Sequence, residues 1–264
     1  MADYTAKDVS ALRQQTGAGM LDSKNALEET GGNMEEAAKL LRMKGLAGAA
    51  KRSDREASEG AVSAVRAGDA AAVAELRCET DFVAKADEFV ALADELAALV
   101  AAKGEDATTE LSDEIDRLRA TLKENISVGR VRRLVAQSGQ VVDTYLHRQA
   151  GRGVNAVAVV LEGGTDELAH DIAVHIAFSK PAYLSRDEVP EGDVAAERAT
   201  LEEISRHEGK PEAALSKIVE GRLTGWFKER VLLDQSYVRD EKQTIAGMLG
   251  SARIVSFAQV VVGD

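Results

Sequence analysis

The sequence predicts an α+β protein in which a small helical domain precedes a duplicated core that carries an inserted helical hairpin. Residues 1–45 contain three short apolar patterns at helical spacing. From Gly60 onward the period changes, and strand-like runs alternate with amphipathic helices. The blocks 60–100 and 139–179 each run in the order glycine, strand, turn, strand, corner, helix. This shared order indicates a duplicated α+β unit, although the blocks share few identical residues.

Composition excludes several classes of protein. The 264 residues include 45 acidic and 33 basic side chains, which gives a formal charge of −12. Proteins that bind the phosphate backbone concentrate Lys and Arg on one face, so we expect no direct contact with nucleic acid. No apolar run approaches the roughly 18 residues of a membrane span, and the first residues lack the pattern of a signal peptide. We therefore expect a cytoplasmic protein with no membrane contact. A single cysteine, Cys78, excludes a disulfide framework and a cysteine-rich metal site.

The helical domain is expected over residues 1–45. Thr5 and Asp8 have the spacing of a capping box at the start of its first helix. A Thr-Gly-Ala-Gly stretch ends that helix, and Asn33 is placed to cap the third helix. Three helices of this size bury little area, so the domain would be only marginally stable alone. The charged residues 46–59 have no clear apolar stripe and indicate a connecting helix or linker.

The first half of the core is expected over residues 60–137. Two apolar runs flank a turn at 67–69 and predict a β-hairpin, whose second strand runs into Glu79-Thr80-Asp81. Phe82 then lies on a corner between a strand and a helix. An isolated aromatic residue is more often a core residue under a polar turn, and the alternative is display to a partner. Apolar residues at helical spacing next predict two helices, followed by a strand.

The second half of the core is expected over residues 138–186 and 223–264. Two strand patterns, at 141–147 and 154–161, precede an amphipathic helix, and the chain closes with a further strand. Residues 187–222 have two helical patterns of their own and predict the inserted hairpin.

The usual catalytic motifs are absent from the sequence. There is no phosphate-binding glycine loop, no nucleophile elbow and no metalloprotease histidine pair. His175 falls on the apolar face of its helix and is expected in the core, whereas His147 ends a strand before a turn and is placed to touch a partner. Cys78 lies in an apolar strand without a nearby base, which is typical of an inert buried thiol. The sequence therefore does not predict an enzyme or a metal centre.

Two long motifs carry a resemblance to a known family. The stretch Leu12-Arg13-x-x-Thr16-Gly17-Ala18-Gly19-Met20-Leu21-Asp22-Ser23-Lys24-x-Ala26-Leu27 resembles the N-terminal motif of bacterial elongation factor Ts. The stretch Cys78-Glu79-Thr80-Asp81-Phe82-Val83-Ala84-Lys85 is similar to the second motif of the same family. Further matches follow at Tyr145-x-His147 and at His175-x-Ala177-x-Ser179-Lys180-Pro181. The chain departs from the family at Gly153, which comes one place early.

The resemblance implies a guanine-nucleotide exchange factor for elongation factor Tu, a GTPase, in its GDP-bound or nucleotide-free form. It also implies an N-terminal domain similar to ubiquitin-associated (UBA) domains, and no cofactor. The resemblance leaves two assemblies open, a homo-oligomer and a 2:2 complex with the GTPase. Two other functions also stay open: an adaptor or chaperone that holds the GTPase without exchange, and an acid–base enzyme that uses Asp81 with His147.

The same resemblance assigns roles to two sets of residues. One set would dislocate Mg²⁺ from the partner, with the Phe82 ring as a wedge: Thr80, Asp81, Phe82, Val83, Ala84 and Lys85. The other set would bind the partner: Arg13, Met20, Leu21, Lys24, His147 and Val238. From the residues alone, Met20 and Leu21 are equally compatible with the core of the helical domain, Arg13 with a solvated helix position, and Asp81 with a turn cap.

Overall fold

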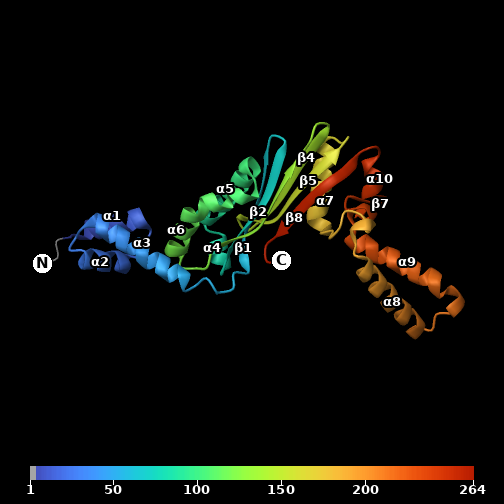
Figure 1. The fold of residues 1–264 in the computed structure, drawn as a ribbon, viewed down its shortest axis with the longest axis horizontal. Coiled ribbons are helices and arrows are strands. Elements are labelled where there is room, and N and C mark those ends of the chain that lie inside the picture. Colours follow the sequence, from blue (N-terminus) through green and yellow to red (C-terminus); the bar gives the residue numbers. More distant parts are fainter. Residues whose placement is uncertain (1–3) are drawn as a thin grey trace.

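The computed structural model describes residues 4–264 as an elongated molecule, with a helical domain at one end and a helical hairpin at the other (Figure 1). The mixed sheet-and-helix core lies between them. This is the predicted α+β architecture. None of the helices within residues 4–264 combines the length and the apolar content needed to cross a membrane.

The N-terminal domain consists of α1 (Ala6–Thr16), α2 (Met20–Glu29) and α3 (Met34–Ala50). The predicted capping box is present, because the Thr5 hydroxyl accepts from Asp8 N–H while the Asp8 carboxylate accepts from Thr5 N–H. Leu12 and Leu27 are fully buried between the helices. α3 continues past the expected boundary at 45, since residues 46–50 contain no proline and, apart from Gly48, only the good helix formers Leu and Ala, and Gly45 packs against Ala120 of α6.

The core contains two three-stranded antiparallel sheets with the same strand order. In the first, β2 (Ala70–Cys78) lies between β1 (Glu59–Ala67) and β3 (Ser127–Val135). In the second, β5 (Arg152–Glu162) lies between β4 (Gln140–Gln149) and β8 (Arg253–Val261). Each half is thus a hairpin, one or more helices, and a third strand that returns to the second strand of the hairpin. The hairpin and the helix after it are the order that the duplicated layout predicts, and the structure adds the returning third strand to each half.

The two sheets pack face to face, and helices cover their outer faces. The layer between the sheets is built from small and β-branched side chains, including Val62, Val73, Val142, Val160 and Val260. On the first sheet lie α5 (Asp87–Lys103), η1 (Glu105–Leu111) and α6 (Ser112–Leu122). On the second lie α7 (Asp166–Ser179), η3 (Leu232–Asp234) and α10 (Ile245–Leu249), next to the short strands β6 (Ser236–Tyr237) and β7 (Asp240–Thr244).

An arginine joins the two halves at the start of β1. The Arg152 guanidinium donates to the Gly60 carbonyl (2.5 Å) and to the Glu59 carboxylate (2.8 Å). Beside it, Gly153 lies so close to the Val62 carbonyl that a Cβ atom would overlap it. The β4–β5 hairpin therefore meets the first sheet by direct backbone contact.

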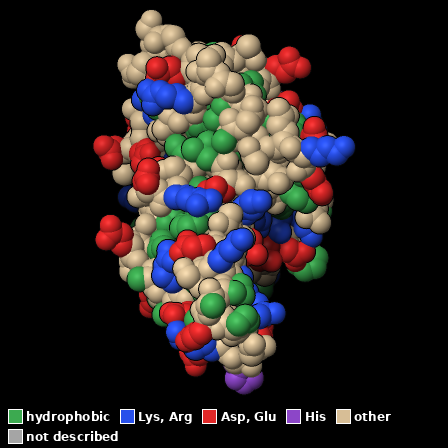
Figure 2. All heavy atoms as spheres, turned by 90° about the vertical axis from the view of Figure 1, so that its right-hand side faces the viewer, with side chains coloured by type: hydrophobic (Ala, Val, Ile, Leu, Met, Phe, Trp, Pro, Cys, Tyr) green, Lys and Arg blue, Asp and Glu red, His purple; other side chains and the backbone are tan. Residues whose placement is uncertain are grey.

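The inserted hairpin consists of α8 (Glu191–His207) and α9 (Glu212–Arg230), preceded by η2 (Arg186–Glu188). The expected limit of the hairpin at 222 falls inside α9. Leu215, Val219, Leu223 and Phe227 recur every four residues and are all buried, so one apolar stripe continues the helix past that point. Figure 2 shows this end of the molecule, where acidic and basic side chains are interspersed and no single sign dominates.

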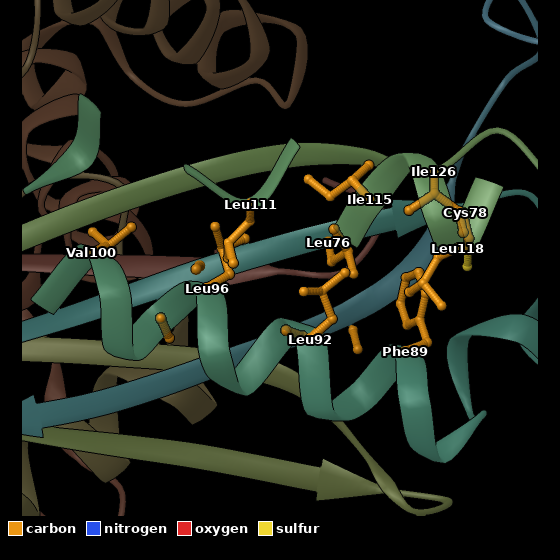
Figure 3. Packing of buried hydrophobic residues seen from close by; sticks show 14 of the residues in the cluster. Leu76, Cys78, Phe89, Leu92, Leu96, Val100, Leu111, Ile115, Leu118 and Ile126 are labelled. Carbon is orange, nitrogen blue, oxygen red and sulfur yellow. The ribbon is translucent and has the colours of Figure 1, made fainter. Parts of the chain in front are cut away.

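The outer layer of the first sheet supports the corner that follows β2. Figure 3 shows the row of side chains that α5 and α6 place against the sheet. At one end of this row, Phe89 of α5, Leu118 of α6 and Cys78 of β2 lie together, and all three are fully buried. Close packing at this point gives β2 a rigid end.

Candidate functional site

The corner after β2 displays an aromatic ring to solvent. β2 ends at Cys78, and α4 (Asp81–Ala84) follows as a single helical turn. Thr80 caps this turn, because its hydroxyl accepts from Val83 N–H (3.4 Å). Ala84 is buried against the core cluster, which turns the opposite side of α4 outward. Phe82 lies on that outer side with 84% of its surface exposed, so the core position expected for an isolated aromatic is wrong here.

Asp81 forms an ion pair within the corner. Lys85 Nζ lies 2.5 Å from Asp81 Oδ2, one helical turn away. The hydrogen bond from Lys85 lowers the pKa of Asp81, so the carboxylate is ionised at neutral pH. The N-cap of α4 is Thr80, and the turn-cap role considered for Asp81 is therefore wrong. Val83 is half-buried and packs on the core below.

Sequence reasoning missed the residue that contacts the corner from below. Glu124, in the loop between α6 and β3, accepts hydrogen bonds from Thr80 and from the backbone N–H of Glu79. These residues are 44 or more positions apart, and no periodic pattern relates them. Only the pairing of β2 with β3 brings them together.

The residues expected to dock the N-terminal domain lie on its surface. Met20 and Leu21 occupy the first turn of α2 with 52% and 68% of their surfaces exposed, so the core alternative for them is wrong. Arg13 and Lys24 are exposed as well. An apolar pair and two cations thus occupy the α1–α2 surface.

The two candidates in the second half of the core differ in environment. His147 is exposed near the end of β4, opposite Asn155 of β5. Val238 is half-buried, and its N–H donates to His175 Nδ1 (3.3 Å). The predicted residues therefore occupy three separate surfaces: the α1–α2 face, the corner, and the second half of the core.

The main clefts formed by residues 4–264 do not include these surfaces. A cleft of about 900 Å³ does lie between the N-terminal helices and α6. Its walls include Asp22, Arg42 and Asp113, but none of the corner or partner-binding candidates. Displayed side chains spread over several elements are typical of a surface that binds another protein.

The buried histidine and cysteine have structural environments. His175 is fully buried, its Nε2 lies 3.0 Å from Gln235 Oε1, and burial lowers its pKa. Burial raises the pKa of Cys78 to about 12, so its thiol stays protonated. Over residues 4–264 no three His, Cys, Asp or Glu side chains gather as metal ligands would.

A second exposed phenylalanine, Phe178, also escaped the sequence reasoning. It lies near the end of α7 and is 75% exposed. Ile172 and Ile176 pack in the core and mark the buried face of α7. Because a helix turns by about 100° per residue, position 178 lies on the opposite face. Helical spacing alone would have found it.

The comparisons with known proteins agree with this architecture. The family described as Elongation factor TS matches residues 79–264, which begin at the corner. Elongation factor Ts of Clavibacter michiganensis subsp. michiganensis is 47% identical over 277 aligned residues, and that of Renibacterium salmoninarum is 46% identical over 280. Both alignments cover 100% of this chain and 100% of the relative.

The chain belongs to the elongation factor Ts family. It is accordingly a translation elongation factor. The full-length alignments also include the helical domain before residue 79, which these two relatives therefore share.

Proposed function

We propose that this chain is a guanine-nucleotide exchange factor for elongation factor Tu, and that Phe82 acts as a wedge that dislocates Mg²⁺ from the GTPase. The exposure of the Phe82 ring is the observation that supports this function. Burying a phenylalanine side chain contributes about 1.5–3 kcal/mol, and here that free energy is available only to a partner.

The exchange needs no bond chemistry. A GTPase holds GDP through its phosphate loop and through Mg²⁺, which neutralises the phosphates. A ring inserted beside the ion displaces the elements that position it, and the nucleotide then leaves more easily. By linkage, a factor that weakens GDP binding is itself weakened by GDP to the same degree. The factor therefore accelerates exchange in both directions and does not set the nucleotide ratio.

The remaining candidates have docking roles in this proposal. Asp81 and Lys85 form a charged pair beside the wedge, which suits polar contacts around the ring. Met20 and Leu21 anchor the N-terminal domain on the GTPase, with Arg13 and Lys24 near them. His147, and with it Val238, contact another part of the partner from the second half of the core.

The test is the release of fluorescent GDP from elongation factor Tu in a stopped-flow instrument. Phe82→Ala is expected to lower the maximal release rate by about tenfold or more while the thermal unfolding midpoint stays unchanged, because the ring is mostly exposed and belongs to none of the hydrophobic clusters of residues 4–264. Phe178→Ala is the matched control, since it removes a comparably exposed ring elsewhere, with 75% of its surface exposed against 84% for Phe82. A native rate for Phe82→Ala would contradict the wedge. Complex formation with no acceleration by the unaltered protein would instead favour the adaptor or chaperone.

A further inference from the structure

The corner that carries Phe82 needs support from outside its own helix. α4 is a single turn of four residues, far shorter than a helix that is stable by itself. A side chain that displaces parts of another protein is effective only if its own backbone does not yield, because otherwise the corner moves instead of the partner. The question is therefore which group holds residues 79–82 in place.

Glu124 makes three hydrogen bonds to the two residues immediately before Asp81. One carboxylate oxygen, Oε1, accepts from the Thr80 hydroxyl (2.5 Å). The other, Oε2, accepts from Thr80 N–H (3.1 Å) and from Glu79 N–H (3.0 Å). The Thr80 hydroxyl meanwhile accepts from Val83 N–H, so Glu124 also orients the group that caps α4.

The loop that carries Glu124 is itself held in return. Glu79 Oε1 accepts from Asn125 N–H (2.7 Å). The Asn125 side-chain amide donates to the carbonyls of Ser53 (3.1 Å) and Arg55 (2.7 Å), in the segment between α3 and β1. Residues 79–80 and 124–125 therefore brace each other reciprocally, and neither side is a free loop.

We infer that Glu124 is a positioning residue for nucleotide exchange, whose carboxylate holds the corner so that the Phe82 ring is presented at a fixed orientation. The inference rests on the proposed function and adds a residue to it. The chemistry explains why a carboxylate is needed. All three partners are donors, and a carboxylate accepts at both oxygens. A glutamine side chain has the same length, and its single oxygen can still accept from the two backbone N–H groups while its NH₂ donates to the Thr80 hydroxyl, but it lacks the negative charge that strengthens these bonds.

The test is a double-mutant cycle on the maximal rate of GDP release from elongation factor Tu. Glu124→Gln is expected to lower that rate about tenfold, because a neutral amide oxygen holds the two backbone N–H groups less strongly than the carboxylate does and the corner loosens. In the Phe82→Ala background the same change is expected to have almost no further effect, because the ring that it positions is gone. Glu95→Gln is the matched control: Glu95 is exposed on α5, and its side chain forms no hydrogen bond or ion pair within residues 4–264.

Two results would overturn the inference. One is a native maximal rate for Glu124→Gln. The other is an equal fold-loss with and without the Phe82 ring, which would mean that Glu124 supports the fold rather than the wedge. If Glu124→Gln does not fold, Thr80→Val removes the hydroxyl that both bonds Glu124 and caps α4, and it is expected to slow release without weakening the binding of the N-terminal domain to the GTPase. A native rate for Phe82→Ala alone would instead refute the proposed function, so the two failures are distinguishable.

Discussion

Replacing Met20 and Leu21 together by alanine is expected to weaken binding to elongation factor Tu without slowing the exchange step. Full burial of a Leu or Met side chain contributes about 1.5–3 kcal/mol. Scaled by the exposed fractions of 68% and 52%, contact with a partner is worth about 1–2 kcal/mol at Leu21 and about 0.8–1.6 kcal/mol at Met20. The sum, about 2–3.5 kcal/mol, corresponds to a roughly 30- to 300-fold higher Kd.

The assay is a titration of the variant against GDP release from elongation factor Tu. The half-saturating concentration is expected to rise by the factor above, while the rate at saturation stays native because the corner is unaltered. The thermal unfolding midpoint is also expected to stay constant, since the domain core is formed by other residues such as Leu12 and Leu27. Met43→Ala is the matched control, because Met43 is equally exposed but lies on α3. An unchanged half-saturating concentration, or a lower rate at saturation, would refute this reasoning.

Two further predictions concern stability and are read by urea unfolding. Burial lowers the pKa of His175, so the unfolded chain takes up the proton at a higher pH than the folded chain does. The contribution of His175 to the free energy of unfolding is therefore fully present above about pH 6.5 and is lost as the pH falls below that value. His175→Gln should flatten this dependence, and equal slopes for both proteins would contradict it. Gly153→Ala is expected to lower the free energy of unfolding by about 1–3 kcal/mol, because the new Cβ would overlap the Val62 carbonyl. Gly225→Ala is the control: position 225 faces open space within α9, and alanine should raise the free energy of unfolding by about 0.5–1 kcal/mol because it is the better helix former. An unchanged stability in Gly153→Ala would show that the two sheets can separate at that point.

Local patterns were sufficient for most of the fold. Leu92, Leu96 and Val100 repeat at helical spacing, and these side chains are buried in α5, where the pattern placed them. The limits of elements were less certain, because a helix ends where its apolar stripe and its packing end. The stripe of α9 continues through Leu223 and Phe227, past the limit expected at 222.

The candidate site was only partly accessible to the same reasoning. A strand-to-helix corner permits either orientation of an aromatic ring, and burial of Ala84 rather than Phe82 decides it. The bonds of Glu124 to Thr80 depend on a tertiary contact across 44 residues, which no local periodicity encodes. Long-range polar contacts of this kind follow from the fold, so they become visible only after the strands are paired.

The structure separates the groups proposed for affinity from the group proposed for exchange, and this separation has a mechanical consequence. The N-terminal domain meets the core at α6, where Gly45 of α3 packs on Ala120 and Asp22 of α2 pairs with Lys123 at the end of α6 (2.9 Å). The ion pair is largely exposed and is worth at most about 1 kcal/mol, so the placement of the domain depends more on close packing at Gly45 and at Gly17, which lies against Thr121, and on the bond from Arg52 to the Arg119 carbonyl (3.0 Å). A larger residue at 45 would shift the Met20–Leu21 anchor relative to the corner. Binding at the anchor would then oppose insertion of Phe82, because a partner bound to the displaced Met20 and Leu21 would no longer have its Mg²⁺ site opposite the ring.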